Sequence, residues 1–172
     1  MENSLFITIL SPVLITCGGL ISWFLKSKKD ELVNAEEKAR EFKITTYRKL
    51  LEPFIAAFTV SISDEERNRE IEKLQSLEYK RAIVDLTTFG SDQTLKTFNK
   101  IIQSFYQSDA YRTDPETWDT YTVKLLALIS EFLLEIRRDV YSKKTRLVRS
   151  ELIESILKDI DQYKTRVNAA KI

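Results

Sequence analysis

The sequence predicts an all-α protein in which one N-terminal transmembrane helix continues into a cytosolic bundle of four to five helices. Three observations support this fold class. Three glycines and three prolines in 172 residues leave few positions for β-turns. Leu, Lys, Glu and Arg, which are good helix formers, dominate the composition. Residues 3–25 carry no charge and, at about 1.5 Å per residue, are long enough to cross a hydrocarbon layer of roughly 30 Å.

The expected domains are therefore a transmembrane helix over residues 1–27 and a helical bundle over residues 28–172. Lys26, Lys28 and Lys29 follow the apolar stretch, and the positive-inside rule places that end in the cytoplasm. The chain has no basic residues before the stretch, which disfavours a cleavable signal, and Thr16 disfavours a lipoprotein cleavage site before Cys17. The predicted location is the bacterial inner membrane, single-pass, with the N-terminus outside.

The apolar stretch has one small, polar side. At about 100° per residue, this side falls within a narrow arc of the helix. One interpretation is that small residues let neighbouring helices pack closely and that hydroxyls bond across them. The other is that the stripe lines a narrow aqueous path in a ring of subunits. Both require several copies, so a homo-oligomer in contact with membrane lipid is expected. The predicted pore-lining or span-packing residues are Ser4, Thr8, Ser11, Ile15, Gly18, Gly19 and Ser22.

A charged amphipathic stretch follows, and it predicts a continuation of the first helix. Leu32, Ala35, Ala39, Phe42 and Thr46 recur at three- and four-residue spacing, which forms an apolar seam too narrow to be buried alone. Further on, a denser apolar pattern indicates that the far end of this helix enters the core of the bundle.

The remaining helices are predicted from their start and stop signals. A helix starting at the capping box of Ser63 and Glu66 extends to about Thr88, and Gly90 ends it. A broad apolar stripe makes the fourth helix of the chain the central one. The later helices are predicted to start at Ser91 or Asp92, at Asp114 followed by Pro115, and at about Ser150, the last one ending near Tyr163.

Catalytic chemistry is not indicated. The chain has no histidine, which is the commonest general base and metal ligand, and it has no glycine-rich phosphate loop. Glu131, Glu135 and Asp139 stack along one helix at four-residue spacing, but without a Glu-x-x-His partner a solvated face is favoured over a metal site. We expect no enzymatic activity, no cofactor, no metal and no small-molecule substrate.

One local concentration of charge stands out against the near balance of 27 basic and 26 acidic residues. Residues 137–149 hold six positive residues and one negative residue. They are either a solvated helix end, where cations favour the negative pole of the dipole, or a contact with RNA phosphates, anionic lipid or a neighbouring subunit. The predicted subunit or partner contacts are Arg137, Arg138, Lys143 and Lys144.

The segments RKLLEPF, RAIVDLTTFGSDQTLKTFNKIIQSF and LLALISEFLLEIRRDV, behind a single N-terminal span, resemble a group of small bacterial membrane proteins with a HEPN-like helical bundle. One of them accompanies the type VI-B CRISPR RNA-guided ribonuclease. The resemblance implies a membrane pore that acts in antiphage defence, with a CRISPR effector or RNA as a further partner. HEPN ribonucleases place a histidine four to six residues after an arginine, whereas Ser142, Lys143, Lys144 and Thr145 follow Arg137 and Arg138 here.

The function predicted from these features is an oligomeric inner-membrane effector that forms a pore or perturbs the membrane. Two alternatives stay open. One is a single-span anchor that binds a cytosolic partner through its bundle, and the other is a degenerate HEPN-type ribonuclease that uses Arg137 and Arg138.

Overall fold

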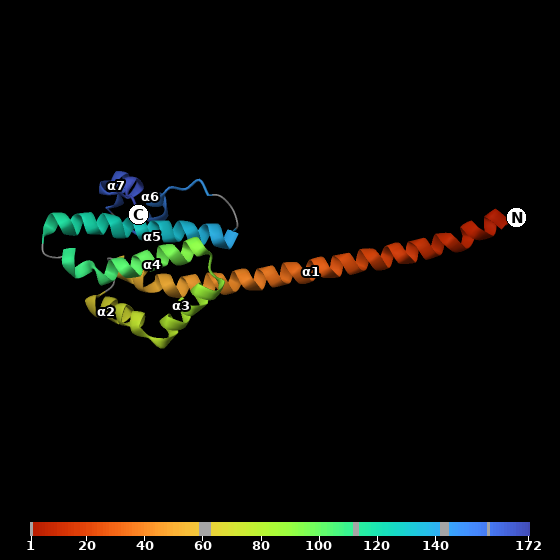
Figure 1. The fold of residues 1–172 in the computed structure, drawn as a ribbon, viewed down its shortest axis with the longest axis horizontal. Helices are drawn as coiled ribbons and strands as arrows, with labels where there is room; N and C mark the ends of the chain where they lie inside the picture. The colour runs from red at the N-terminus through yellow and green to blue at the C-terminus, as the bar shows by residue number, and fades with distance from the viewer. Residues whose placement is uncertain (1, 59–62, 112–113, 142–144, 158) are drawn as a thin grey trace. The chain divides into compact units, whose positions relative to one another are not determined.

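The computed structural model describes residues 2–58, 63–111, 114–141, 145–157 and 159–172, and in the first helix it describes the side chains of residue 20 and of residues from 22 to 56. Within these ranges every regular element is a helix, so the predicted all-helical fold is confirmed. The helices are α1 (Glu2–Phe58), α2 (Asp64–Glu72), α3 (Leu77–Phe89), α4 (Asp92–Tyr106), α5 (Pro115–Tyr141), α6 (Arg149–Ile153) and α7 (Lys164–Ala169), with short 3₁₀ turns at Lys73–Gln75, Ser108–Tyr111 and Ile160–Gln162 (Figure 1).

The chain divides into two compact units, residues 1–42 (unit 1) and residues 43–172 (unit 2). Unit 1 consists of the first part of α1, and the helix continues past residue 42 as predicted for the charged stretch. The division lies beyond the domain boundary at residue 27 that the sequence predicted.

The predicted membrane helix is wrong. Among the described residues, no helix combines the length and the apolar character needed to cross a membrane. A span needs about 20 predominantly apolar residues. The described side chains of α1 are those of residue 20 and residues 22–56, and five of the six residues from Lys26 to Glu31 are charged, so the described part of α1 contains no such run. This finding overturns the transmembrane helix over residues 1–27 and, with it, the predicted single-pass location in the bacterial inner membrane with the N-terminus outside and the bundle in the cytoplasm.

Several predicted helix ends are confirmed by their hydrogen bonds. The backbone N–H of Glu66 donates to Ser63 Oγ at 3.2 Å, and the backbone N–H of Ser63 donates to the Glu66 carboxylate at 3.1 Å, which is the expected capping box. Ser91 caps α4 by accepting from the backbone N–H of Thr94 at 3.2 Å. The Asp114 carboxylate accepts from the backbone N–H of Thr117 at 3.0 Å, immediately before Pro115 opens α5.

The single helix predicted from Ser63 to about Thr88 is wrong, because the helical conformation is interrupted at Ser76. The Ser76 backbone is extended, with φ −66° and ψ 153°, and its side chain accepts from the backbone N–H of Tyr79 at 3.1 Å. A serine in this conformation satisfies an unpaired N–H of a new helix, so α3 starts here instead of continuing α2.

The single last helix predicted from about Ser150 to Tyr163 is also wrong. The chain forms α6, then turns and a 3₁₀ segment, and then α7. Asn168 explains part of this path, because it accepts from the backbone N–H of Ser150 at 3.1 Å and donates to Ser150 Oγ at 3.0 Å. These bonds hold α7 against the start of α6, and Ile153, Ile160 and Val167 are all buried in one cluster.

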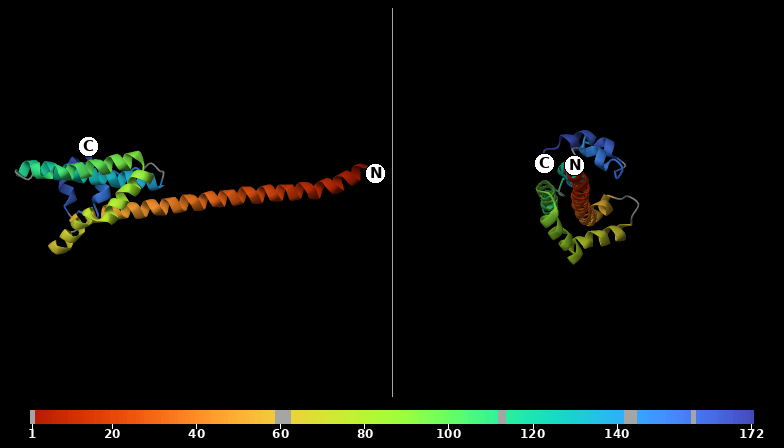
Figure 2. Two further views of the ribbon diagram at one scale, coloured as in Figure 1. Left: turned by 60° about the horizontal axis from the view of Figure 1, so that its bottom comes forward. Right: turned by 90° about the vertical axis from the view of Figure 1, so that its right-hand side faces the viewer.

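Helix α5 is central to unit 2, as its broad apolar stripe predicted. One side shares a core cluster with buried residues of α1, α3 and α4, and α4 and α5 lie side by side in the views of Figures 1 and 2. The other side packs against α6 and α7. The first cluster centres on Leu50, Leu86, Phe98, Ile101, Leu128 and Phe132, and the second on Val123, Leu126, Ala127, Ile153, Ile160 and Val167.

Candidate interaction site

The stripe predicted to line a pore falls largely outside the described side chains. Its residues belong to α1 by backbone. The side chains of Ser4, Thr8, Ser11, Ile15, Gly18 and Gly19 lie outside the described set, and Ser22 is exposed. No contact among the described residues therefore bears on the predicted stripe.

The predicted basic contact residues differ in their surroundings. Arg137 is exposed at the C-terminal end of α5. Arg138 forms an ion pair with Glu135 and lies 3.6 Å from the Glu131 carboxylate. Lys143 and Lys144 lie outside the described residues. Arg138 is thus tied to acidic side chains of its own helix, while Arg137 faces solvent.

A second arginine of the basic segment is also neutralised. Arg149 Nε donates to the Glu131 carboxylate at 2.6 Å, and Arg149 Nη1 donates to the carbonyl of Ala170 at 2.7 Å. Arg149 therefore holds the C-terminal segment against α5. Arg138 and Arg149 are therefore ion-paired with acidic side chains of α5, whereas Arg137 and Arg146 of the same segment are exposed.

The three stacked carboxylates of α5 do not form a common site. Glu131 and Glu135 face the arginines, whereas Asp139 faces α1 and α4. Among the described residues, no group of three or more metal-ligating side chains gathers. The solvated face expected for this row is wrong for Asp139, whose side chain is only 9% exposed.

Asp139 is the centre of a polar cluster that the sequence did not predict. Its carboxylate accepts from Lys43 Nζ at 2.8 Å, from the Tyr47 hydroxyl, and from the backbone N–H of Ser91 at 3.1 Å. These donors come from α1 and from the start of α4, 48 to 96 residues away in the chain. No local sequence signal marks such a contact. The only hint is an acidic residue near the end of an otherwise apolar stripe.

The electrostatics of this cluster support a structural role. Burial by itself raises the pKa of Asp139, but the hydrogen bonds from Lys43, Tyr47 and Ser91 outweigh it and hold the pKa below its ordinary value. Burial, and then the hydrogen bond to Asp139, raise the pKa of Tyr47. At neutral pH the pair is thus a carboxylate and a neutral phenol, which suits a fixed junction of three helices.

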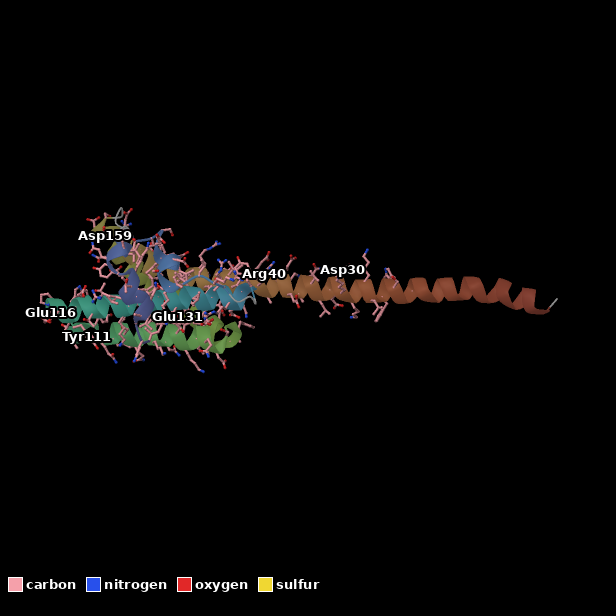
Figure 3. The ribbon with its side chains drawn as sticks, turned by 90° about the horizontal axis from the view of Figure 1, so that it is seen from above. Asp30, Arg40, Tyr111, Glu116, Glu131 and Asp159 are labelled. Atoms are coloured by element: carbon pink, nitrogen blue, oxygen red, sulfur yellow. The ribbon has the colours of Figure 1, made fainter. Side chains whose placement is uncertain are left out.

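The remaining candidate is the exposed apolar seam of α1 in unit 1, defined by Leu25, Leu32, Ala35 and Ala39. Leu25 and Leu32 are 62% and 65% exposed, and Ala35 and Ala39 are also exposed. At 100° per residue these four side chains lie on one side of the helix. Figure 3 labels Asp30 and Arg40 on the same part of α1, and the spacing of 100° per residue places both off the seam. Phe42, which the sequence also assigned to the seam, is 41% exposed.

The described part of unit 2 contains an apolar hollow of about 40 Å³. It is lined by side chains of α1, α5 and α6 and the turn that follows, among them Phe54, Ile129 and Ile153. This volume is close to that of one or two water molecules, and the lining offers no polar partner. The hollow therefore has room for one or two molecules of that size and offers them no hydrogen bond.

Comparison of the chain with protein-family models, curated proteins and solved structures finds no match. The resemblance to CRISPR-associated membrane proteins with a HEPN-like bundle therefore stays a prediction from the sequence.

Proposed function

We propose that this protein is a non-enzymatic assembly protein that associates with further copies of itself through the seam of α1, and so joins copies of the chain into one assembly. One observation carries the proposal. Leu25 and Leu32 are more than 60% exposed on one side of a helix, at the spacing that a second helix fills. Ala35 and Ala39 on the same side allow a close approach of the two backbones.

The energetics favour association over exposure of the seam. Burial of apolar surface contributes roughly 25 cal/mol per Å². In a single helix the seam stays exposed to water. When a second copy packs along it, the apolar surface of both seams is buried and contributes to association. The seam is a narrow stripe with two core positions per heptad, so one partner helix is enough to cover it.

The ribonuclease alternative receives less support. Arg138 is ion-paired with Glu135, so its charge is already balanced. The pore hypothesis required a membrane span, and the correction of the span removes that support. Incubation of the purified protein with labelled RNA is a direct check, and specific cleavage that Arg137→Ala abolishes would favour the ribonuclease.

Analytical ultracentrifugation of the full chain over a range of concentrations tests the proposal. We expect association that strengthens with concentration, and its loss in Leu32→Asp, because a carboxylate cannot be buried along the seam. Val33→Asp is the matched control. Val33 is the next residue, is 46% exposed and points away from the seam. A monomeric wild-type protein, or equal loss in both variants, would refute the proposal.

A further inference from the structure

The charges beside the seam are arranged in a fixed order. In heptad terms Leu25, Leu32 and Ala39 occupy one core position, and Lys28, Ala35 and Phe42 occupy the other. The residues that flank this core are Lys29, Glu31, Glu36 and Lys38. Such flanking charges set the orientation of paired helices, because opposite charges attract across the interface and like charges repel.

A parallel, in-register pair of seams is disfavoured by these charges. In that arrangement a flanking residue lies beside the residue five positions later in the other helix. Glu31 of each copy would then lie beside Glu36 of the other copy, which places like charges together twice. The side chains of both residues are exposed, and Glu31 forms an ion pair with Lys28 of its own helix at 2.9 Å.

An antiparallel pair places opposite charges together. In this arrangement Leu32 of one copy packs on Ala35 of the other. The twofold symmetry then also packs Leu32 of the second copy on Ala35 of the first. Glu31 then lies beside Lys38 of the second copy, and Lys29 lies beside Glu36 of the second copy. Each of these pairs occurs twice, so four attractive pairs flank the core. All of the residues involved belong to unit 1.

The packing of the core agrees with this register. Each Leu32 lies against an alanine of the second copy, so a large side chain meets a small one in the two central layers. Lys28 lies opposite Ala39 of the second copy, where its methylene stem covers the methyl group while its ammonium group reaches outward. In the single chain that ammonium group is already held toward the flank by Glu31, at 2.9 Å.

From this pattern we infer that the partner of the seam is a second copy of α1 in antiparallel orientation, in the register that pairs Leu32 with Ala35, Glu31 with Lys38 and Lys29 with Glu36. The inference rests on the proposed function, since it names the orientation and the contacts of that self-association. The two chains then leave the paired segment at opposite ends.

Charge reversal at Glu31 distinguishes the two orientations by the sign of its effect. In the antiparallel pair Glu31→Lys turns two attractive contacts into two repulsive ones, and we expect the dissociation constant of the dimer to rise about tenfold. The double variant Glu31→Lys with Lys38→Glu restores the contacts and is expected to return the constant to within about threefold of wild type. In a parallel pair the single variant would tighten the dimer.

Glu37→Lys is the matched control for this experiment. Glu37 lies on the opposite side of α1 and, like Glu31, has a basic side chain three residues from it, at 4.0 Å from Arg40. Its reversal therefore removes a similar contact within the helix and leaves the seam unchanged. We expect the dissociation constant of Glu37→Lys to stay within about twofold of wild type.

A distance measurement tests the orientation independently. A spin label at Leu20→Cys, in a Cys17→Ser background, occupies an exposed position off the seam. In the antiparallel register the two labels lie about 40 Å apart along the axis, because 27 residues at about 1.5 Å each separate them. In a parallel pair they lie within about 20 Å of each other.

The outcomes separate this inference from the proposed function. A wild-type protein that is monomeric at every concentration overturns both. A dimer that Leu32→Asp disrupts, but that Glu31→Lys tightens or leaves unchanged, overturns only the antiparallel register. Labels close together in such a dimer overturn it as well. A weaker Glu31→Lys dimer, its rescue by Lys38→Glu and distant labels support it.

Discussion

Helix α1 carries the same residue type in two opposite environments. Leu32 in unit 1 is 65% exposed, whereas Leu50 in unit 2 is completely buried. Both lie in apolar patterns of helical period. The two stripes differ in width. Leu50 is followed by Leu51 and Phe54, which widen its stripe enough to bury it in a bundle core, while the seam around Leu32 is narrow. A wide stripe is satisfied within its own chain, and a narrow one leaves room for a single helix from elsewhere.

The largest effect is expected in the bundle core. Phe132 has no exposed surface, and its ring centroid lies 5.5 Å from that of Phe98. Phe132→Ala leaves a cavity between α4 and α5 and is expected to lower the free energy of unfolding by about 3 to 5 kcal/mol. Urea denaturation followed by circular dichroism measures this change. Leu77→Ala, at a position 64% exposed, is the control, and equal losses in the two variants would contradict the assignment of the core.

A smaller effect is expected where α3 ends. A Cβ atom at Gly90 would lie 2.6 Å from the Leu86 carbonyl oxygen and 2.7 Å from Leu86 Cδ1. The φ of Gly90 is −76°, which any residue adopts, so it is the lack of space that requires glycine. Gly90→Ala is expected to cost about 2 kcal/mol, measured by thermal unfolding. An unchanged midpoint would show that the junction between α3 and α4 yields without cost.

Asp139 joins helices through charge and not through apolar contact. Asp139→Asn keeps the shape of the side chain but removes the negative charge that faces Lys43, and is expected to lower the free energy of unfolding by about 1 to 2 kcal/mol at neutral pH. Glu37→Gln, an exposed carboxylate of unit 1, is the control and should change it little.

The dependence on pH follows from the lowered pKa of Asp139. Its pKa in the folded protein lies below its ordinary value of 3.8, so the folded state favours the ionised form. This contribution is fully present above pH of about 4 and is lost as the pH falls through the folded pKa. Acid should therefore destabilise the wild type more steeply than Asp139→Asn below pH of about 4. If the free energies of unfolding of the two proteins fell in parallel with pH, Asp139 would not be ionised and bonded in the cluster as described.

Some helix ends could be predicted from the sequence, and others could not. The capping box at Ser63, the cap at Ser91 and the start at Pro115 depend on residues within one turn, and each was predicted correctly. The break at Ser76 was missed because serine is tolerated inside helices, and only its extended backbone shows that it caps α3.

Contacts between distant residues were not predicted, for a related reason. Asp139 meets Lys43 across 96 residues, and Ser150 meets Asn168 across 18. Their residue types follow no periodic pattern. The predicted membrane span depended on the lack of charge in residues 3–25, which is a property of composition, whereas the seam depended on spacing. The spacing of apolar residues identified a surface that the structure leaves exposed. The lack of charge in residues 3–25 led to a membrane span, which was wrong.

The smallest effect is expected in unit 1, where the comparison with Leu50 is most direct. At dilution, where the protein is monomeric, Leu32→Ala removes a side chain that already faces water, and the free energy of unfolding should change by less than about 0.5 kcal/mol. Leu50→Ala, the matched change in unit 2, should cost about 2 to 5 kcal/mol. At higher concentration the dissociation constant of self-association can be compared as well. There Leu32→Ala has the larger effect of the two variants, since only Leu32→Ala weakens self-association. A large loss for Leu32→Ala at dilution would mean that the seam is already covered within the single chain, because only a buried side chain leaves a cavity when it is shortened.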